Sequence, residues 1–151
     1  MERIVWTNGC FDILHVGHVE LFKFAKQQGT KLYVGIKLFK YAKQQGTKLY
    51  VGVDSDEKVK KDKGQDRPFN TLLDRTNLLL AIKYIDKVIP FDSTEELETT
   101  IKNLSPDVMV IGGDWKGKIV IGEQYTKHLK FFNRIPGYST TNILEWKKHQ
   151  L

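Results

Sequence analysis

Residues 4–18 read IVWTNGCFDILHVGH, and this stretch decides the fold. It begins with a β-prone run at residues 4–7 and then meets Asn8 and Gly9, a pair that breaks regular structure, which predicts a buried strand feeding a loop. From His18 onward apolar residues recur at helical spacing until Gly29, a typical helix terminator. The chain therefore opens with a strand, a loop and a helix.

The rest of the chain alternates strand-like and helix-like segments. Apolar runs predict strands at residues 48–53, 88–89, 108–111 and 129–132, and helices are predicted at 71–82, at 93–103 and after Ser139. Thr71 is the expected N-cap of the 71–82 helix, with Asp74 as its acidic partner and an apolar face made of Leu72, Leu73, Leu79, Leu80 and Ile82. Residues 54–70 are interpreted as a polar, lysine-rich loop. This alternation predicts an α/β fold with a parallel sheet and helices on both faces.

Length and composition exclude several classes of protein. A chain of 151 residues with 40% hydrophobic residues is expected to form one folded domain over residues 1–151. Its single cysteine, Cys10, excludes an internal disulfide, and no partners for a structural zinc site accompany it. No apolar run reaches the roughly 18 residues of a membrane span, and no secretory pattern is present, so we expect a cytoplasmic protein without membrane contact.

A tandem repeat occupies residues 21–54. Residues 21–37 read LFKFAKQQGTKLYVGIK and residues 38–54 read LFKYAKQQGTKLYVGVD, which differ at only three positions. A doubly wound sheet has room for one copy of each element. We expect the helix of the first copy and the strand of the second to keep the core positions, with residues of about 29–47 extruded or peripheral; an extra edge element and a swapped dimer are alternatives.

The repeat also accounts for most of the net charge of +6. Removing residues 37–53 would remove four lysines and no acid, which lowers the charge from +6 to +2. Solvated lysines on a helix face explain this excess more simply than a nucleic-acid surface does. We therefore expect no nucleic-acid partner.

The chemical signal is the pair His15 and His18, with Gly17 between them, where the first loop meets the first helix. A helix N-terminus has unpaired N–H groups and a partial positive charge, both of which suit phosphate oxygens. Two imidazoles there can donate to one phosphate chain, and Gly17 lets a ligand approach the backbone. Zinc ligation is the alternative, but no third ligand of usual spacing lies nearby.

The chain resembles the small nucleotidyltransferases with an HxGH signature, which include cytidylyltransferases and the adenylyltransferase domain of ADP-heptose synthesis. The resemblance rests on residues 7–18, on Arg75 early in a helix, on the GGDW sequence at 112–115 and on the YSTT sequence at 138–141. Four matches in the same order cover nearly the whole chain. They imply a single Rossmann-like domain, a homodimer, and nucleotide and phosphate binding by residues at these positions.

The candidate site residues follow from these motifs. Catalytic roles are expected for His15, His18, Lys61 and Arg75, and nucleotide binding for Gly9, Cys10, Phe11, Gly17, Lys63, Gly113, Asp114, Trp115, Arg134, Ser139, Thr140 and Thr141. We expect Mg²⁺ to bridge the triphosphate with few protein ligands, and no protein metal site.

Each candidate also has a plain structural explanation. Lysines 58, 60, 61 and 63 with Arg67 crowd one loop, which favours a bound anion, but a solvated loop is the alternative. Arg75 could form a surface salt bridge with Asp74 or Asp62. Ser139 could be an ordinary N-cap and Trp115 a packed side chain, and Cys10 is interpreted as small packing rather than a nucleophile.

The resemblance implies attack of an acceptor phosphate on the α-phosphorus of a nucleoside triphosphate, with release of pyrophosphate. ATP with a sugar phosphate such as heptose 1-phosphate is favoured, because the residues that resemble the ADP-heptose-type adenylyltransferases (63–64, 67–70, 113–114 and 140–143) extend through more of the chain. CTP with glycerol 3-phosphate is the alternative, since residues 114–118 (DWKGK) and Arg134 resemble that cytidylyltransferase. A non-catalytic module that binds nucleotide or nucleic acid is the third hypothesis.

Overall fold

The computed structural model describes residues 3–29, 47–133, 135–139 and 143. Five parallel strands form one sheet in the order β3-β2-β1-β4-β5. The strands are β1 (Arg3–Gly9), β2 (Thr47–Asp54), β3 (Lys87–Phe91), β4 (Val108–Gly112) and β5 (His128–Phe132). The helices are α1 (Val16–Gln28), α3 (Asp56–Lys63), α4 (Leu72–Leu80) and α5 (Thr94–Leu104), with short 3₁₀ turns η1 (Gly113–Trp115) and η2 (Glu123–Tyr125). The predicted α/β fold is confirmed.

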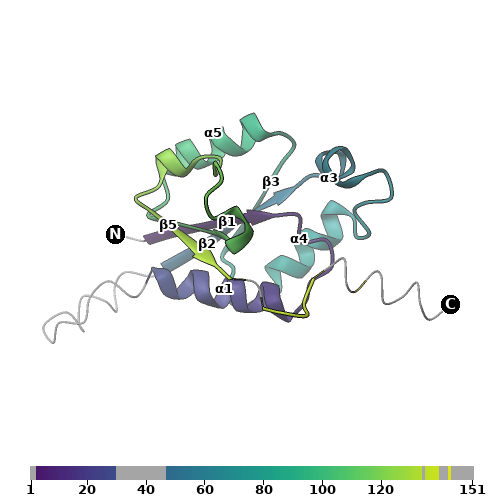
Figure 1. Cartoon of the computed structure of the whole chain (residues 1–151), viewed down its shortest axis with the longest axis horizontal. Coiled ribbons are helices and arrows are strands. Elements are labelled where there is room, and N and C mark those ends of the chain that lie inside the picture. The colour runs from purple at the N-terminus through teal and green to yellow at the C-terminus, as the bar shows by residue number, and fades with distance from the viewer. Residues whose placement is uncertain (1–2, 30–46, 134, 140–142, 144–151) are drawn as a thin grey trace, which may run out of the picture.

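Helices cover both faces of the sheet. Figure 1 shows α5 on one side of the strands and α1 and α4 on the other. The central strand β1 alternates accordingly, because successive side chains of a strand point to opposite faces. Val5 packs with Phe22 of α1 and Leu79 of α4, whereas Trp6 packs with Ile101 of α5, and all five are fully buried. The two core layers therefore hold the strand ends in a fixed arrangement.

The tandem repeat divides between two elements as expected. Helix α1 ends with residues of the first copy, and β2 is built from the second copy. The flanking residues decide which copy supplies which element. Helix α1 continues from the His15 loop, and β2 runs directly into Asp54. The expected extrusion of residues of about 29–47 falls mainly on residues 30–46, which lie outside the described residues.

The predicted loop at residues 54–70 is wrong in part, because α3 occupies its first half. The hydroxyl of Ser55 caps this helix by accepting from the backbone N–H of Lys58 at 3.2 Å. Asp56 and Glu57 lie in its first turn, and the last turn carries lysines. Acids at the start and cations at the end both stabilise a helix dipole. Charge order along the chain, rather than an apolar stripe, is the signal for this helix.

Helix α4 starts where Thr71 predicts it, and the Thr71 hydroxyl accepts from the N–H of Asp74 at 3.2 Å. The helix has nine residues and is shorter than predicted. Leu79 is fully buried, but Leu73 is 69% and Leu80 52% exposed, so the predicted apolar face is wrong at these two residues. Of the helix predicted after Ser139, only Ile143 is described. Among the described residues, every helix is too short or too polar to cross a membrane.

Candidate active site

A cavity of about 810 Å³ lies at the carboxyl ends of the strands. Its walls include Asn8 and Gly9 of β1, Asp54 of β2, Gly112 of β4 and Phe132 of β5. Open parallel sheets place ligands at this edge, because the loops that follow neighbouring strands converge there. Of the described candidates, it brings together Gly9, Cys10, Phe11, His15, Gly17, His18, Lys63, Asp114, Trp115 and Ser139.

The two histidines form a stacked pair at the N-terminus of α1. Their ring centroids lie 3.9 Å apart with the planes 23° from parallel. His15 is the N-cap, and its Nδ1 accepts from the N–H of Gly17 at 3.1 Å. In a neutral imidazole the proton then resides on Nε2, which leaves a donor on the far side of the ring. A Cβ on Gly17 would lie 2.9 Å from Cε1 of His15, so a larger residue at position 17 would push the His15 ring out of this position.

Phe11 supports the pair from the core side. Its backbone φ of 47° is unusual for a bulky residue and is typical of a constrained functional turn. The turn places its buried ring against Gly9 and edge-on to His18, with ring centroids 5.3 Å apart. The expected role of Phe11 in nucleotide binding thus includes a packing contact that orients His18.

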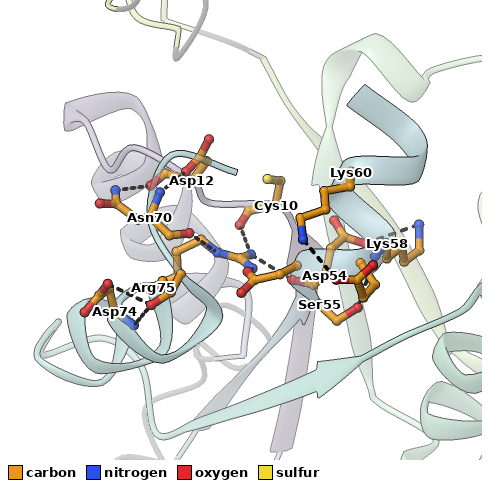
Figure 2. Close-up of polar contacts among 12 residues, drawn as sticks. Cys10, Asp12, Asp54, Ser55, Lys58, Lys60, Asn70, Asp74 and Arg75 are labelled. Carbon is orange, nitrogen blue, oxygen red and sulfur yellow. Dashed lines mark hydrogen bonds and ion pairs between the residues drawn. The ribbon is translucent and has the colours of Figure 1, made fainter. Parts of the chain in front are cut away.

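Asp12 connects the first loop to residues 67–70 by hydrogen bonds, and the sequence motifs do not predict this contact. Its buried carboxylate accepts from the backbone N–H groups of Phe69 (2.9 Å) and Asn70 (2.8 Å) and from Nε of Arg67 (2.7 Å). Burial opposes ionisation, but the three hydrogen bonds outweigh it and lower the pKa of Asp12 below its usual value. Asn70 returns a side-chain bond to the carbonyl of Asp12, as Figure 2 shows.

Arg75 lies behind the cavity wall, and the expectation that it touches a ligand needs correction. Its side chain is fully buried, and a buried guanidinium cannot reach a phosphate in the cavity. Instead, it donates to the carbonyls of Asn70 (3.1 Å), Cys10 (2.8 Å) and Asp54 (2.7 Å), and to the carboxylate of Asp56 (2.7 Å). Figure 2 shows the hydrogen bonds of Arg75 with Asn70, Cys10 and Asp54. The surface salt bridge with Asp74 or Asp62 is likewise not formed by Arg75, which bonds Asp56.

The basic residues after β2 divide into two groups. Lys58, Lys63 and Arg67 line the cavity, whereas Lys60 pairs with Glu57 at 3.0 Å and Lys61 is exposed outside the cavity lining. The predicted catalytic lysine, Lys61, is therefore not brought to the other candidates. Helical spacing explains the difference, because residues 61 and 63 of one helix point in different directions.

Lys58, one of the lysines that favour a bound anion, lines the cavity. Its ammonium lies 3.4 Å from the Asp54 carboxylate and 2.5 Å from that of Asp62. Burial by itself would lower the pKa of Lys58. The two acids raise it by more than burial lowers it, so the pKa lies above its ordinary value and Lys58 stays cationic. Each acid is four residues from Lys58, so helical spacing brings these charges together.

Part of the cavity lining is more apolar. Ile111, Val120 and Ile121 line it together with Asp114 and Trp115, whose side chain is 48% exposed. Gly113 is not part of the lining: a Cβ there would lie 2.9 Å from Oδ1 of Asn133, so the close approach it allows is to the chain after β5. Arg134, Thr140 and Thr141 lie outside the described residues, while Ser139 lines the cavity.

Cys10 contributes its backbone more than its thiol. Its carbonyl accepts from Arg75, and burial raises the pKa of the thiol above its usual value, although Lys63 and Arg75 act in the opposite direction. A raised pKa reduces the thiolate needed for nucleophilic attack. This agrees with interpreting Cys10 as packing.

A family model described as "Cytidylyltransferase-like" matches residues 6–37 and 36–145, and the two segments meet within the tandem repeat. The chain therefore belongs to the cytidylyltransferase-like family of nucleotidyltransferases, which confirms the resemblance stated from its motifs.

Two curated relatives carry the name "Bifunctional protein HldE". The one from Nitratiruptor sp. is 42% identical over 144 residues, which cover 95% of this chain and 27% of that protein. The one from Sulfurimonas denitrificans is 40% identical over 150 residues, which cover 99% and 28%. The chain thus spans about a quarter of the length of these relatives.

Among solved structures, the chain is similar to the crystal structure of the lipopolysaccharide core biosynthesis protein from Thermoplasma volcanium. The match has a TM-score of 0.60 at 22% identity and covers 91% of this chain and 98% of that one. It supports the fold.

Proposed function

We propose that the protein transfers a nucleotidyl group from a nucleoside triphosphate, with ATP favoured, to the phosphate of a phosphorylated sugar such as heptose 1-phosphate. The observation that carries this proposal is the stacked His15 and His18 pair at the N-terminus of α1, beside a cavity at the carboxyl ends of the strands. The similarity to the HldE proteins and the motif resemblance to the adenylyltransferase domain of ADP-heptose synthesis support this acceptor.

The reaction forms one P–O bond and breaks another. An oxygen of the acceptor phosphate attacks the α-phosphorus, and the bond from that phosphorus to the bridging oxygen breaks, so that pyrophosphate leaves with the electron pair. The acceptor oxygen is already ionised at neutral pH, and no general base is required. Catalysis then depends on alignment and on groups that neutralise charge as it moves to the leaving oxygens.

The polar residues of the cavity suit this chemistry. His15 and His18 supply imidazole donors, the first turn of α1 supplies backbone N–H groups, and Lys63 supplies a positive charge. Ser139 adds a hydroxyl from the C-terminal segment. Trp115 and the apolar part of the lining would accept the base, and Asp114 would accept its hydrogen bonds.

Mg²⁺ remains part of the proposal as the partner of the triphosphate. Carboxylate oxygens are suitable ligands, and Asp54, Asp62 and Asp114 line the cavity. Across residues 3–29, 47–133, 135–139 and 143, no group of three or more metal-binding side chains is found. Phosphate oxygens and water would therefore supply most of the ligands, and the ion would neutralise phosphate charge.

A turnover screen tests the proposal. ATP and CTP are each paired with heptose 1-phosphate and with glycerol 3-phosphate, and pyrophosphate release is measured. We expect release with ATP and heptose 1-phosphate. Release only with CTP and glycerol 3-phosphate would instead support the second candidate, which the resemblance of residues 114–118 to that cytidylyltransferase favours.

Binding measured beside turnover addresses the non-catalytic hypothesis. Calorimetry that detects nucleotide binding while no pair releases pyrophosphate would overturn the enzymatic proposal. Salt-sensitive binding to DNA or RNA would point to a nucleic-acid module instead. We also propose a homodimer, as the family resemblance implies, and light scattering would test it by molar mass.

A further inference from the structure

Tyr138 extends the histidine pair into a longer row of rings. Its ring lies parallel to that of His15, with centroids 6.4 Å apart and planes 28° from parallel. This separation lies within the range of favourable aromatic pairs. Phe11, His18, His15 and Tyr138 therefore follow one another from the buried core to the cavity wall.

The position of Tyr138 in the chain makes this contact important. Tyr138 directly precedes Ser139, and both line the cavity. The N–H of Ile143 donates to the carbonyl of Ser139 at 3.1 Å, which is the spacing of an α-helical turn, and Ile143 is helical. Tyr138 thus joins Ser139 in the chain and lies near the N-terminus of α1 in space.

Tyr138 also lies close to the backbone at the start of α1. A Cβ on Gly17 would lie 3.5 Å from Cβ of Tyr138, which is ordinary van der Waals contact. The His15 ring accordingly has His18 stacked on it and Tyr138 nearby, and its Nδ1 accepts from the N–H of Gly17. A ring restrained in this way keeps the direction of its Nε2.

We propose that Tyr138 is a positioning residue, whose ring orients His15 and holds the Ser139 segment against the N-terminus of α1. The proposal rests on the proposed nucleotidyl transfer for its effect on rate, but not for the contact itself. Tyr138 remains 48% exposed, which is unusual for a ring needed only for the core. Its hydroxyl is not required, because the contact is made by the ring.

Three variants test the idea. Tyr138→Phe keeps the ring, Tyr138→Ala removes it, and Leu80→Ala removes a comparably exposed apolar side chain outside the cavity lining. We expect Tyr138→Ala to lower kcat about 10-fold, since an aromatic pair contributes enough for a change of this order. Tyr138→Phe and Leu80→Ala should stay within about twofold of the wild type, and the melting temperature should barely change.

A second readout uses the free protein. The Cε1–H resonance of His15 in NMR spectra should shift in Tyr138→Ala, which loses the ring current, and stay near its wild-type position in Tyr138→Phe. An unmoved resonance in Tyr138→Ala would overturn the contact, and a moved resonance with unchanged kcat would overturn the positioning role. If the wild type releases no pyrophosphate with any substrate pair, the proposed function fails, and the resonance alone decides whether Tyr138 orients His15.

Discussion

Gly29 and Thr47 lie against each other at the junction of α1 and β2, although residues 30–46 separate them in the chain. A Cβ on Gly29 would lie 2.3 Å from Cγ2 of Thr47, which is closer than real side chains approach. The backbone carbonyl of Gly29 also accepts from Arg3 at 3.4 Å, which places it beside the start of β1. The end of the helix and the start of the strand are therefore already adjacent.

Deletion of residues 30–46 should leave the fold intact. It joins Gly29 to Thr47 and restores one copy of the repeated GTKLYVG sequence. Because closing a shorter loop costs less entropy, we expect the free energy of unfolding to rise by about 2 kcal/mol. Urea unfolding of the deleted and full-length chains measures this. A strong loss of stability would mean that the removed residues contribute to the folded core.

Replacement of His18 tests the charge-neutralising site. We expect His18→Ala to lower kcat by about 100- to 1000-fold, because removing one donor to the transition state has an effect of this size. Circular dichroism and the melting temperature control for folding. Unchanged turnover in a folded variant would remove the stacked pair from the mechanism.

The two lysines near the end of α3 allow a matched comparison. Lys63 lines the cavity and Lys61 does not, so we expect Lys63→Ala to lower kcat/KM at least about 10-fold more than Lys61→Ala. Both changes remove one positive charge from the same turn, and the effect on net charge is therefore equal. Equal losses in both variants would contradict the placement of α3.

Arg75 should matter for stability. Arg75→Met leaves the Asp56 carboxylate and three carbonyls without their donor, and we expect a loss of about 3 kcal/mol in the free energy of unfolding. Asp56→Asn keeps an oxygen acceptor and is partly exposed, so it should cost about 1 kcal/mol. Chemical unfolding compares the two. A Met variant as stable as the wild type would show that these contacts contribute little.

Asp12 should make stability depend on pH in the acid range. Because its folded-state pKa lies below the ordinary 3.8, the carboxylate stabilises the fold above that pH, and this stabilisation is lost as the pH falls through the folded-state pKa. Asp12→Asn should cost about 2 kcal/mol at pH 7 and less at low pH.

Unfolding of the wild type, Asp12→Asn and the exposed control Asp66→Asn at pH 7, 5, 4 and 3 would measure this. The difference in the free energy of unfolding between the wild type and Asp12→Asn should decrease as the pH falls. The difference between the wild type and Asp66→Asn should stay small at every pH. If Asp12→Asn lowers the free energy of unfolding by the same amount at every pH, Asp12 is not the titrating group.

The order of strands and helices was predictable because each depends on residues close in sequence. Residues 4–7 form a strand from their own composition, and Thr71 caps its helix with a hydroxyl three residues from the N–H it accepts. The missed helix α3 has a single buried residue, Val59, so it lacks the apolar periodicity on which prediction relies.

The sequence by itself determined the parallel α/β sheet and the pair His15 and His18, because strand periodicity and a helix N-terminus are local properties. Only the tertiary structure decided that Asp12 binds Asn70, 58 positions away, and that Arg75 binds Cys10, 65 positions away. Likewise, it separated Lys63 from Lys61 and placed Tyr138 on His15. Such contacts depend on how strands and loops are brought together in space, and residue spacing along the chain carries no record of that.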